Sequence, residues 1–372
     1  MSDQIAFSEE QAMLLDTATE FCRKHSPIET VRARLGADQI DAATWQEITE
    51  LGWLGINVAE EFGGLGLGLS CVVPVAESMG RYLMGSPYSG AIIASECLAT
   101  SGSRTQKEEW LPKIVSGAIG SMALTEPNGS WLLDEIGAQA VERADRLELS
   151  GTKCFVTDAD TSDFCIVSVN VEAQARLVLV KREQIPAGNL HREVVIDETR
   201  RSYQLDLDGI TVPLDQLLKG SDFQAIEFAS LLLLSAEIAG GLVGSIHTIV
   251  EYLNTRKAFD KVIGSYQALK HPTVKILLDL EAMRSHLYHA ATRLAEGNTD
   301  ETEVALRMAK AHGSAAFAFA GDRAVQFHGG FGFTYDCDAQ LYLRRALWCQ
   351  YQFGDEAYHR HLLEPMLLDQ TG

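Results

Sequence analysis

The chain has 372 residues and an apolar fraction of 46%, so it is long enough to bury a substantial core in two or three domains. Its formal net charge of −20 disfavours nucleic acid as a partner, because binding to phosphates needs clustered lysine and arginine side chains. The first residues, MSDQIAFSEEQ, are acidic and polar, and we expect no secretory signal there.

Seven cysteines are scattered along the chain, and none of them forms a CxxC pair. This spacing predicts neither a zinc site nor a disulfide framework. We therefore expect no metal site, reduced thiols and a cytoplasmic location.

Three zones of different residue pattern follow one another along the chain. Apolar residues recur at helical spacing in residues 1–120, which predicts an N-terminal helical domain. Residues 121–222 change to short alternating runs separated by turn residues, which predicts a middle domain of antiparallel strands. Long helical apolar faces return in residues 223–372 and predict a C-terminal four-helix-bundle domain. Helices on either side of a block of strands indicate an α+β fold.

Residues 228–250 are the one stretch of the sequence that resembles a membrane span. They contain Glu237 and His247, and charged groups are costly inside a membrane. We expect a buried helix of the bundle and no membrane span.

Four short segments contain the motifs that indicate a chemical function. They are residues 123–127 (ALTEP), 151–157 (GTKCFVT), 256–259 (RKAF) and 326–333 (QFHGGFGF). Each segment alone is equally typical of an ordinary turn beside a strand or helix. The glycine cluster of the fourth segment permits close approach of a ligand, and its amides can face a phosphate.

Together, in this order and spacing, the four segments resemble the acyl-CoA dehydrogenase family, and the resemblance covers nearly the whole chain. Residues 51–56 (LGWLGI) and 60–66 (EEFGGLG) are also similar to that family. The resemblance implies α,β-desaturation of an acyl-CoA. In that reaction a carboxylate removes the α-proton, the β-hydrogen leaves as hydride to FAD, and an electron-transferring flavoprotein takes the electrons.

The resemblance also implies the residues of the cofactor and substrate sites. Leu124 and Thr125 would lie beside the flavin ring, and Phe155 and Thr157 would flank it. Ser130 would lie in the loop that contacts CoA. A further set would hold the pyrophosphate and adenosine half of an FAD whose ring sits in a neighbouring subunit: Arg256, Phe259, Gln267, Gln326, Gly329 and Gly330. FAD then bridges two chains, which implies a dimer or a dimer of dimers.

The sequence departs from the family at the catalytic base. The family's usual glutamate lies in a Tyr-Glu-Gly-Thr motif, and here Phe353 stands in its place and cannot accept a proton. Some members carry the glutamate instead at the start of a long C-terminal helix, where this chain has Ser230 and Leu231.

Two acidic side chains near the first of these positions could replace the missing base. Asp355 and Glu356 are the candidates for a relocated base, and the alternative for both is a solvated acidic pair. His359 and His361 are expected at the surface.

The CoA loop departs from the family as well. It is one residue shorter than the family's, and Trp131 replaces an aspartate.

The favoured hypothesis is a subunit of a heteromeric acyl-CoA dehydrogenase that completes the FAD site of a catalytic partner chain. Unequal subunits occur in family branches that act on bulky CoA thioesters, including steroid side chains, so the expected assembly is a heterotetramer. Three alternatives stay open. They are a self-sufficient dehydrogenase with a relocated base, a flavin-dependent oxygen-using enzyme of the same fold, and a structural subunit without flavin.

Overall fold

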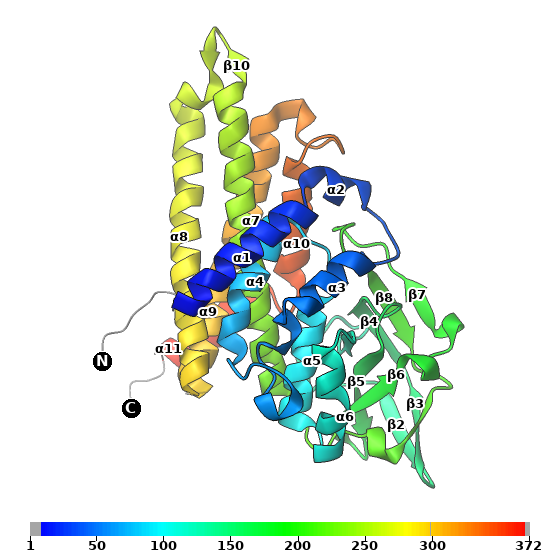
Figure 1. Ribbon diagram of the computed structural model, residues 1–372. Helices are drawn as coiled ribbons and strands as arrows, with labels where there is room; N and C mark the ends of the chain where they lie inside the picture. Colours follow the sequence, from blue (N-terminus) through cyan, green and yellow to red (C-terminus); the bar gives the residue numbers. More distant parts are fainter. Residues whose placement is uncertain (1–8, 298, 369–372) are drawn as a thin grey trace. The chain divides into compact units, whose positions relative to one another are not determined.

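The computed structural model describes residues 9–297 and 299–368 (Figure 1). The start of the chain, for which we expected no signal, lies largely outside these residues. Two compact units are built from interleaved segments of the chain. One comprises the residues up to Leu35, Val72–Met84 and those from Leu231 onward, and the other comprises Gly36–Cys71 and Gly85–Ser230. The predicted domain ranges 1–120, 121–222 and 223–372 follow chain order instead and stay a prediction.

The N-terminal part of the chain is helical, as predicted. Local side chains fix where its helices begin: Asp41 accepts hydrogen bonds from two first-turn amides, and Ser103 and Gln106 form a reciprocal capping box. The helices are α1 (Glu9–His25), α2 (Ile28–Ala33), α3 (Ala42–Glu50), α4 (Val73–Arg81), α5 (Tyr88–Ser101) and α6 (Arg104–Val115).

Strands follow in the middle of the chain, and they form two separate sheets. The larger sheet has the order β1-β5-β2-β3-β9, with β6 paired to β5, and the smaller has the order β4-β8-β7. The strands are β1 (Gly120–Ala123), β2 (Gln139–Arg143), β3 (Arg146–Ser150), β4 (Thr152–Thr157), β5 (Phe164–Val171), β6 (Gln174–Lys181), β7 (Leu190–Arg192), β8 (Ser202–Asp206) and β9 (Thr211–Pro213).

The prediction of antiparallel strands needs one correction. β1 pairs with β5 in parallel from Gly120 opposite Phe164 to Ala123 opposite Val167, and β2 meets β5 in parallel at a single residue pair. All other strand pairs in these two sheets are antiparallel. The long connection between β1 and β5 contains three further strands, and a connection of that length lets the chain return in the same direction.

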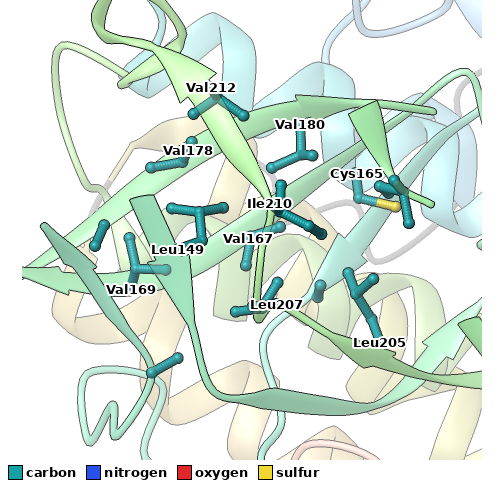
Figure 2. Close-up of a cluster of buried hydrophobic side chains, with 14 of the residues drawn as sticks. Leu149, Cys165, Val167, Val169, Val178, Val180, Leu205, Leu207, Ile210 and Val212 are labelled. Carbon is teal, nitrogen blue, oxygen red and sulfur yellow. The ribbon is translucent and has the colours of Figure 1, made fainter. Parts of the chain in front are cut away.

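Alternating apolar residues of both sheets meet in one buried core (Figure 2). Val167, Val178 and Leu205 are fully buried there. The alternation that predicted strands in residues 121–222 is therefore the pattern of side chains that point into this core.

Long helices make up the C-terminal part of the chain, as predicted, and α9 packs against α8, α10 and α11. They are α7 (Phe223–Thr255), α8 (Gln267–Glu296), α9 (Thr299–His328), α10 (Ala339–Tyr351) and α11 (Glu356–Leu368). The apolar window of α7 is 89% buried, which is the environment of a core helix and not of a membrane span. Gly241 of α7 faces Phe317 of α9 so closely that a Cβ atom there would lie 2.2 Å from the phenyl ring.

Candidate functional site

Phe155 stands on a bulge of β4. The register between β4 and β8 shifts between Lys153 and Val156, and Phe155 has a left-handed backbone with φ of 55°. Glu193 holds this conformation, because its Oε2 accepts bonds from the Phe155 amide at 3.0 Å and from the Ser202 hydroxyl at 2.7 Å. The Phe155 side chain is 45% exposed, so an apolar ring is available to a planar ligand.

The predicted flavin-ring residues come together in this unit. The Cys154 amide donates to the Thr125 carbonyl at 2.8 Å, and the Ser121 hydroxyl donates to the Thr157 carbonyl at 2.6 Å. The segment after β1, with Leu124 and Thr125, therefore runs beside β4, which carries Phe155 and Thr157.

Ser130 lies further along in the loop that follows. Its hydroxyl donates to Glu135 at 2.8 Å, so its contact in the structure is internal to the loop.

The predicted adenosine-side residues lie in the other unit, at one end of its long helices. α7 ends directly before Arg256, and the chain then forms a hairpin of β10 (Lys257–Ala258) and β11 (Lys261–Val262), which projects beyond α7 and α8 in Figure 1. Phe259 lies at the tip of the hairpin with φ of 53° and is 92% exposed. Gln267 is the first residue of α8.

The other residues of this predicted set lie at the end of α9 and directly after it. The rings of His328 and Tyr252 stack at 4.0 Å, which joins the end of α9 to the last turns of α7. Gly329 and Gly330 come next, and a Cβ atom at either glycine would meet no atom within 4 Å.

These residues fit an anionic nucleotide. In the described ranges 9–297 and 299–368, no carboxylate pairs with the exposed guanidinium of Arg256, and guanidinium groups bind pyrophosphates well. The open space above the two glycines lets a ligand approach the backbone closely. Arg256, Phe259, Gln267 and Gln326 would thus hold such a group from this end of the helices.

Phe353, which the sequence predicts at the position of the family's base, lies on a turn that buried side chains contact. Phe353 and Gly354 have left-handed backbones with φ of 53° and 102°. The Nζ atom of the buried Lys310 donates to the carbonyls of Gly354 at 2.5 Å and Gln350 at 3.0 Å, and to the Ser314 hydroxyl at 2.9 Å. Burial lowers the pKa of Lys310 to about 7.

His359 is fully buried, and the prediction of a surface position for it was wrong, whereas His361 is exposed as predicted. The Nε2 atom of His359 lies 2.9 Å from the Phe353 carbonyl, so Nε2 carries the proton and Nδ1 faces Arg307 at 3.4 Å. Burial, with the nearby cations of Lys310 and Arg307, lowers the pKa of His359 to about 3, so the imidazole is neutral. The turn needs this buried hydrogen bond, which the spacing of two histidines around Arg360 could not reveal.

The candidates for a relocated base have local partners. Asp355 accepts the Tyr358 amide at 2.9 Å at the start of α11, and Glu356 forms an ion pair with Arg360 at 2.6 Å. Ser230 and Leu231, which the sequence predicts at the alternative position of the base, are buried within α7.

Sequence reasoning missed three of the polar groups that organise these segments. Glu193 supports Phe155, Lys310 supports the Phe353 turn, and Lys153 forms a buried ion pair with Glu126 at 2.7 Å. The two lysines each lie inside an otherwise apolar or alternating stretch, and an interrupting charge at a core position is the signal that could have found them.

Comparisons with known proteins show which family and fold the chain has. Residues 8–118 match the family model of the acyl-CoA dehydrogenase N-terminal domain, and residues 232–367 match that of the C-terminal domain. Acyl-CoA dehydrogenase FadE12 of Mycobacterium tuberculosis is 29% identical over 316 residues, which is 78% of this chain and 78% of that protein.

Two solved structures have the same fold over nearly the whole chain. A chain of the ChsE4–ChsE5 complex from Mycobacterium tuberculosis superposes with a TM-score of 0.88 at 24% identity, over 99% of this chain and 100% of the other. A chain of a variant of the steroid ACAD Tcur3481–Tcur3483 superposes with a TM-score of 0.87 at 25% identity, over 97% and 98% of the two chains.

Proposed function

Because the chain belongs to the acyl-CoA dehydrogenase family, we propose that it is an FAD-dependent subunit for α,β-desaturation of an acyl-CoA and completes the FAD site of a catalytic partner chain. FAD, when bound, supplies the acceptor for the hydride. This chain's own residues bind and orient: Arg256 opposes the pyrophosphate, and Phe155 and Thr157 flank the ring. The observation that carries the proposal is Phe353, a side chain without an ionisable group, on the turn where the family has its base.

The surroundings of that turn support the proposal. Two buried side chains donate to the turn, Lys310 to the Gly354 carbonyl and His359 to the Phe353 carbonyl, and Arg307 contacts His359 from behind. Asp355 accepts the Tyr358 amide and Glu356 pairs with Arg360, and these local partners support the proposal that neither is a relocated base. The proposed chain thus keeps an ordered cofactor fold and lacks proton abstraction.

The exposed aromatic side chain of Phe259 supports a partner chain. Phe259 is 92% exposed at the hairpin tip, where contact with a second chain or its nucleotide would remove its ring from solvent. One similar structure is the ChsE4–ChsE5 complex, and on that basis we propose a heterotetramer of two kinds of subunit.

The substrate class, the electron acceptor and the location belong to the same proposal. One similar structure is described as a steroid ACAD, so the proposed substrate is a bulky or steroid-type acyl-CoA. An electron-transferring flavoprotein would accept the electrons. The seven cysteines all lie in the part of the chain that the structure describes, and none of them forms a disulfide there, which supports the proposed cytoplasmic location.

The visible spectrum of the full chain supplied with FAD, recorded before and after anaerobic addition of a panel of acyl-CoAs, tests the function. We expect that flavin is either absent from the chain alone or bound without being bleached by any substrate, and that bleaching occurs once a partner chain with the missing glutamate is co-expressed. Bleaching of the chain alone would contradict the proposal and favour the self-sufficient dehydrogenase.

Arg256→Ala tests the cofactor role in the complex with the partner. We expect at least a tenfold weaker retention of FAD, because the substitution removes a charge-assisted bond to the pyrophosphate. Arg143→Ala, which removes an exposed arginine of β2, is the control and should retain FAD like the wild type. Unchanged flavin content in Arg256→Ala would favour a structural subunit.

A further inference from the structure

A buried lysine joins the two segments that flank the proposed flavin ring. Lys153 of β4 is completely buried, and its Nζ atom has three acceptors: Glu126 Oε1 at 2.7 Å, Ser168 Oγ at 2.9 Å and the Leu124 carbonyl at 3.4 Å. An ammonium group has three donors, so all of its hydrogen-bonding capacity is directed at the segment after β1 and at β5. Lys153 thus connects three neighbouring chain segments.

Glu126 extends this connection to a fourth segment. Its carboxylate accepts the amides of Gly137 at 2.8 Å and Ala138 at 2.9 Å as well as the bond from Lys153. Burial alone would raise the pKa of Glu126, but these bonds hold its pKa below the usual value, so the group is ionised. One carboxylate therefore closes the loop between residues 126 and 138.

A buried ion pair of this kind is weak evidence for a role in stability, because desolvation of the two charges offsets most of their attraction. Apolar residues of similar volume would fill the same space without that cost. In some proteins such pairs are retained for the geometry that they impose, since hydrogen bonds to an ammonium and a carboxylate are directional. Here the geometry imposed is the separation between residues 124–126 and β4.

We propose that Lys153 and Glu126 are positioning residues for the flavin ring, which set the spacing between the Leu124–Thr125 backbone and the Phe155–Thr157 stretch. The inference rests on the proposed function, since it assumes that FAD binds these residues. Phe155 and Thr157 follow Lys153 on the same strand, and the Cys154 amide donates to the Thr125 carbonyl at 2.8 Å. A shift of Lys153 would therefore move both sides of the ring site relative to each other.

Four forms of the full chain test the inference: wild type, Lys153→Met, the double variant Lys153→Met with Glu126→Leu, and Leu149→Ala. Leu149→Ala is the control, because it creates a cavity in the same β core without touching the ion pair. The readouts are the Kd for FAD, the visible spectrum of bound flavin and the unfolding temperature.

We expect Lys153→Met to weaken FAD binding at least tenfold and to alter the fine structure of the flavin spectrum. The double variant should have a higher unfolding temperature than Lys153→Met, because no buried charge is left unpaired. It should stay below wild type, because the Gly137 and Ala138 amides lose their acceptor, and it should recover neither the affinity nor the spectrum. Leu149→Ala should lower the unfolding temperature and leave Kd within twofold of wild type.

Recovery of FAD affinity in the double variant, or an equal loss in Leu149→Ala, would overturn the inference and make the pair purely structural. If the wild-type chain binds no FAD alone, the same four forms are measured in the complex with the partner chain. Failure of FAD to bind there too would overturn the proposed function, whereas wild-type affinity in Lys153→Met would overturn only this inference. If Lys153→Met does not fold, Ser168→Ala decides between the same outcomes, since it removes one acceptor and leaves both charges in place.

Discussion

The buried His359, which donates to the Phe353 carbonyl, makes the stability of the fold depend on pH. Its folded pKa of about 3 lies below the ordinary value near 6.5, so between these values the unfolded chain binds a proton that the folded chain excludes. This contribution to stability is complete above about pH 6.5 and is lost as the pH falls towards 3.

His359→Gln should therefore make the chain less sensitive to acid. Glutamine can still donate to the Phe353 carbonyl but does not titrate. The slope of the unfolding free energy against pH, measured between pH 4 and 6, should therefore fall by up to about 1.4 kcal/mol per pH unit. Urea denaturation at a series of pH values measures this slope. His361→Gln, on the exposed face of the same helix, should leave it unchanged, and equal slopes in all three proteins would contradict the assignment.

Phe353→Glu should restore proton abstraction to this chain. The resemblance to the family predicts the base at residue 353, which lies on a left-handed turn, and a general base typically contributes about 10² to 10⁴ in rate. We expect acyl-CoA to bleach the bound flavin at least about 100-fold faster than in wild type. Phe353→Gln, of similar size and without a charge, is the control; equal rates in both variants would argue against a base at this position.

At the level of elements, Gly241 marks the contact of α7 with α9. Gly241→Ala should lower the free energy of unfolding by about 1–3 kcal/mol, because the new methyl group collides with Phe317, even though alanine favours a helix by about 1 kcal/mol. Chemical denaturation measures the change.

Gly188 provides the control for this prediction. At Gly188 a Cβ atom would meet nothing within 4 Å, so Gly188→Ala should have little effect on the free energy of unfolding. In a double-mutant cycle, Phe317→Leu should reduce the loss of stability caused by Gly241→Ala. If the two effects simply add, the destabilisation does not come from the contact between residues 241 and 317.

The elements were largely predictable because their signal is local. Helical spacing identified the stretch that became α7, and alternation identified β3, β5, β6 and β8. The parallel pairing of β1 with β5 was not predictable, since two strands far apart in sequence carry no local mark of their relative direction. The hairpin after α7 was also missed, because its strands have two residues each and no alternation.

The candidate site was predictable only where it resembles known motifs. Phe155, Arg256 and Phe353 were identified in this way, and their roles stay a prediction. Glu193 and Lys310 were not identified, because each supports a turn through a contact with a residue distant in sequence. Buried polar partners of this kind are set by tertiary structure, which residue spacing alone does not encode.

For the whole molecule, the interleaving of segments between the two units has a consequence during synthesis on the ribosome. α1 and α4 pack together in a unit whose long helices come from the segment that begins at Leu231. The apolar faces of α1 and α4 emerge early, and the long helices of their unit emerge only in the last part of translation. A nascent chain of this protein therefore carries incompletely packed apolar helices for most of its synthesis, which is the situation in which chaperones protect chains from aggregation.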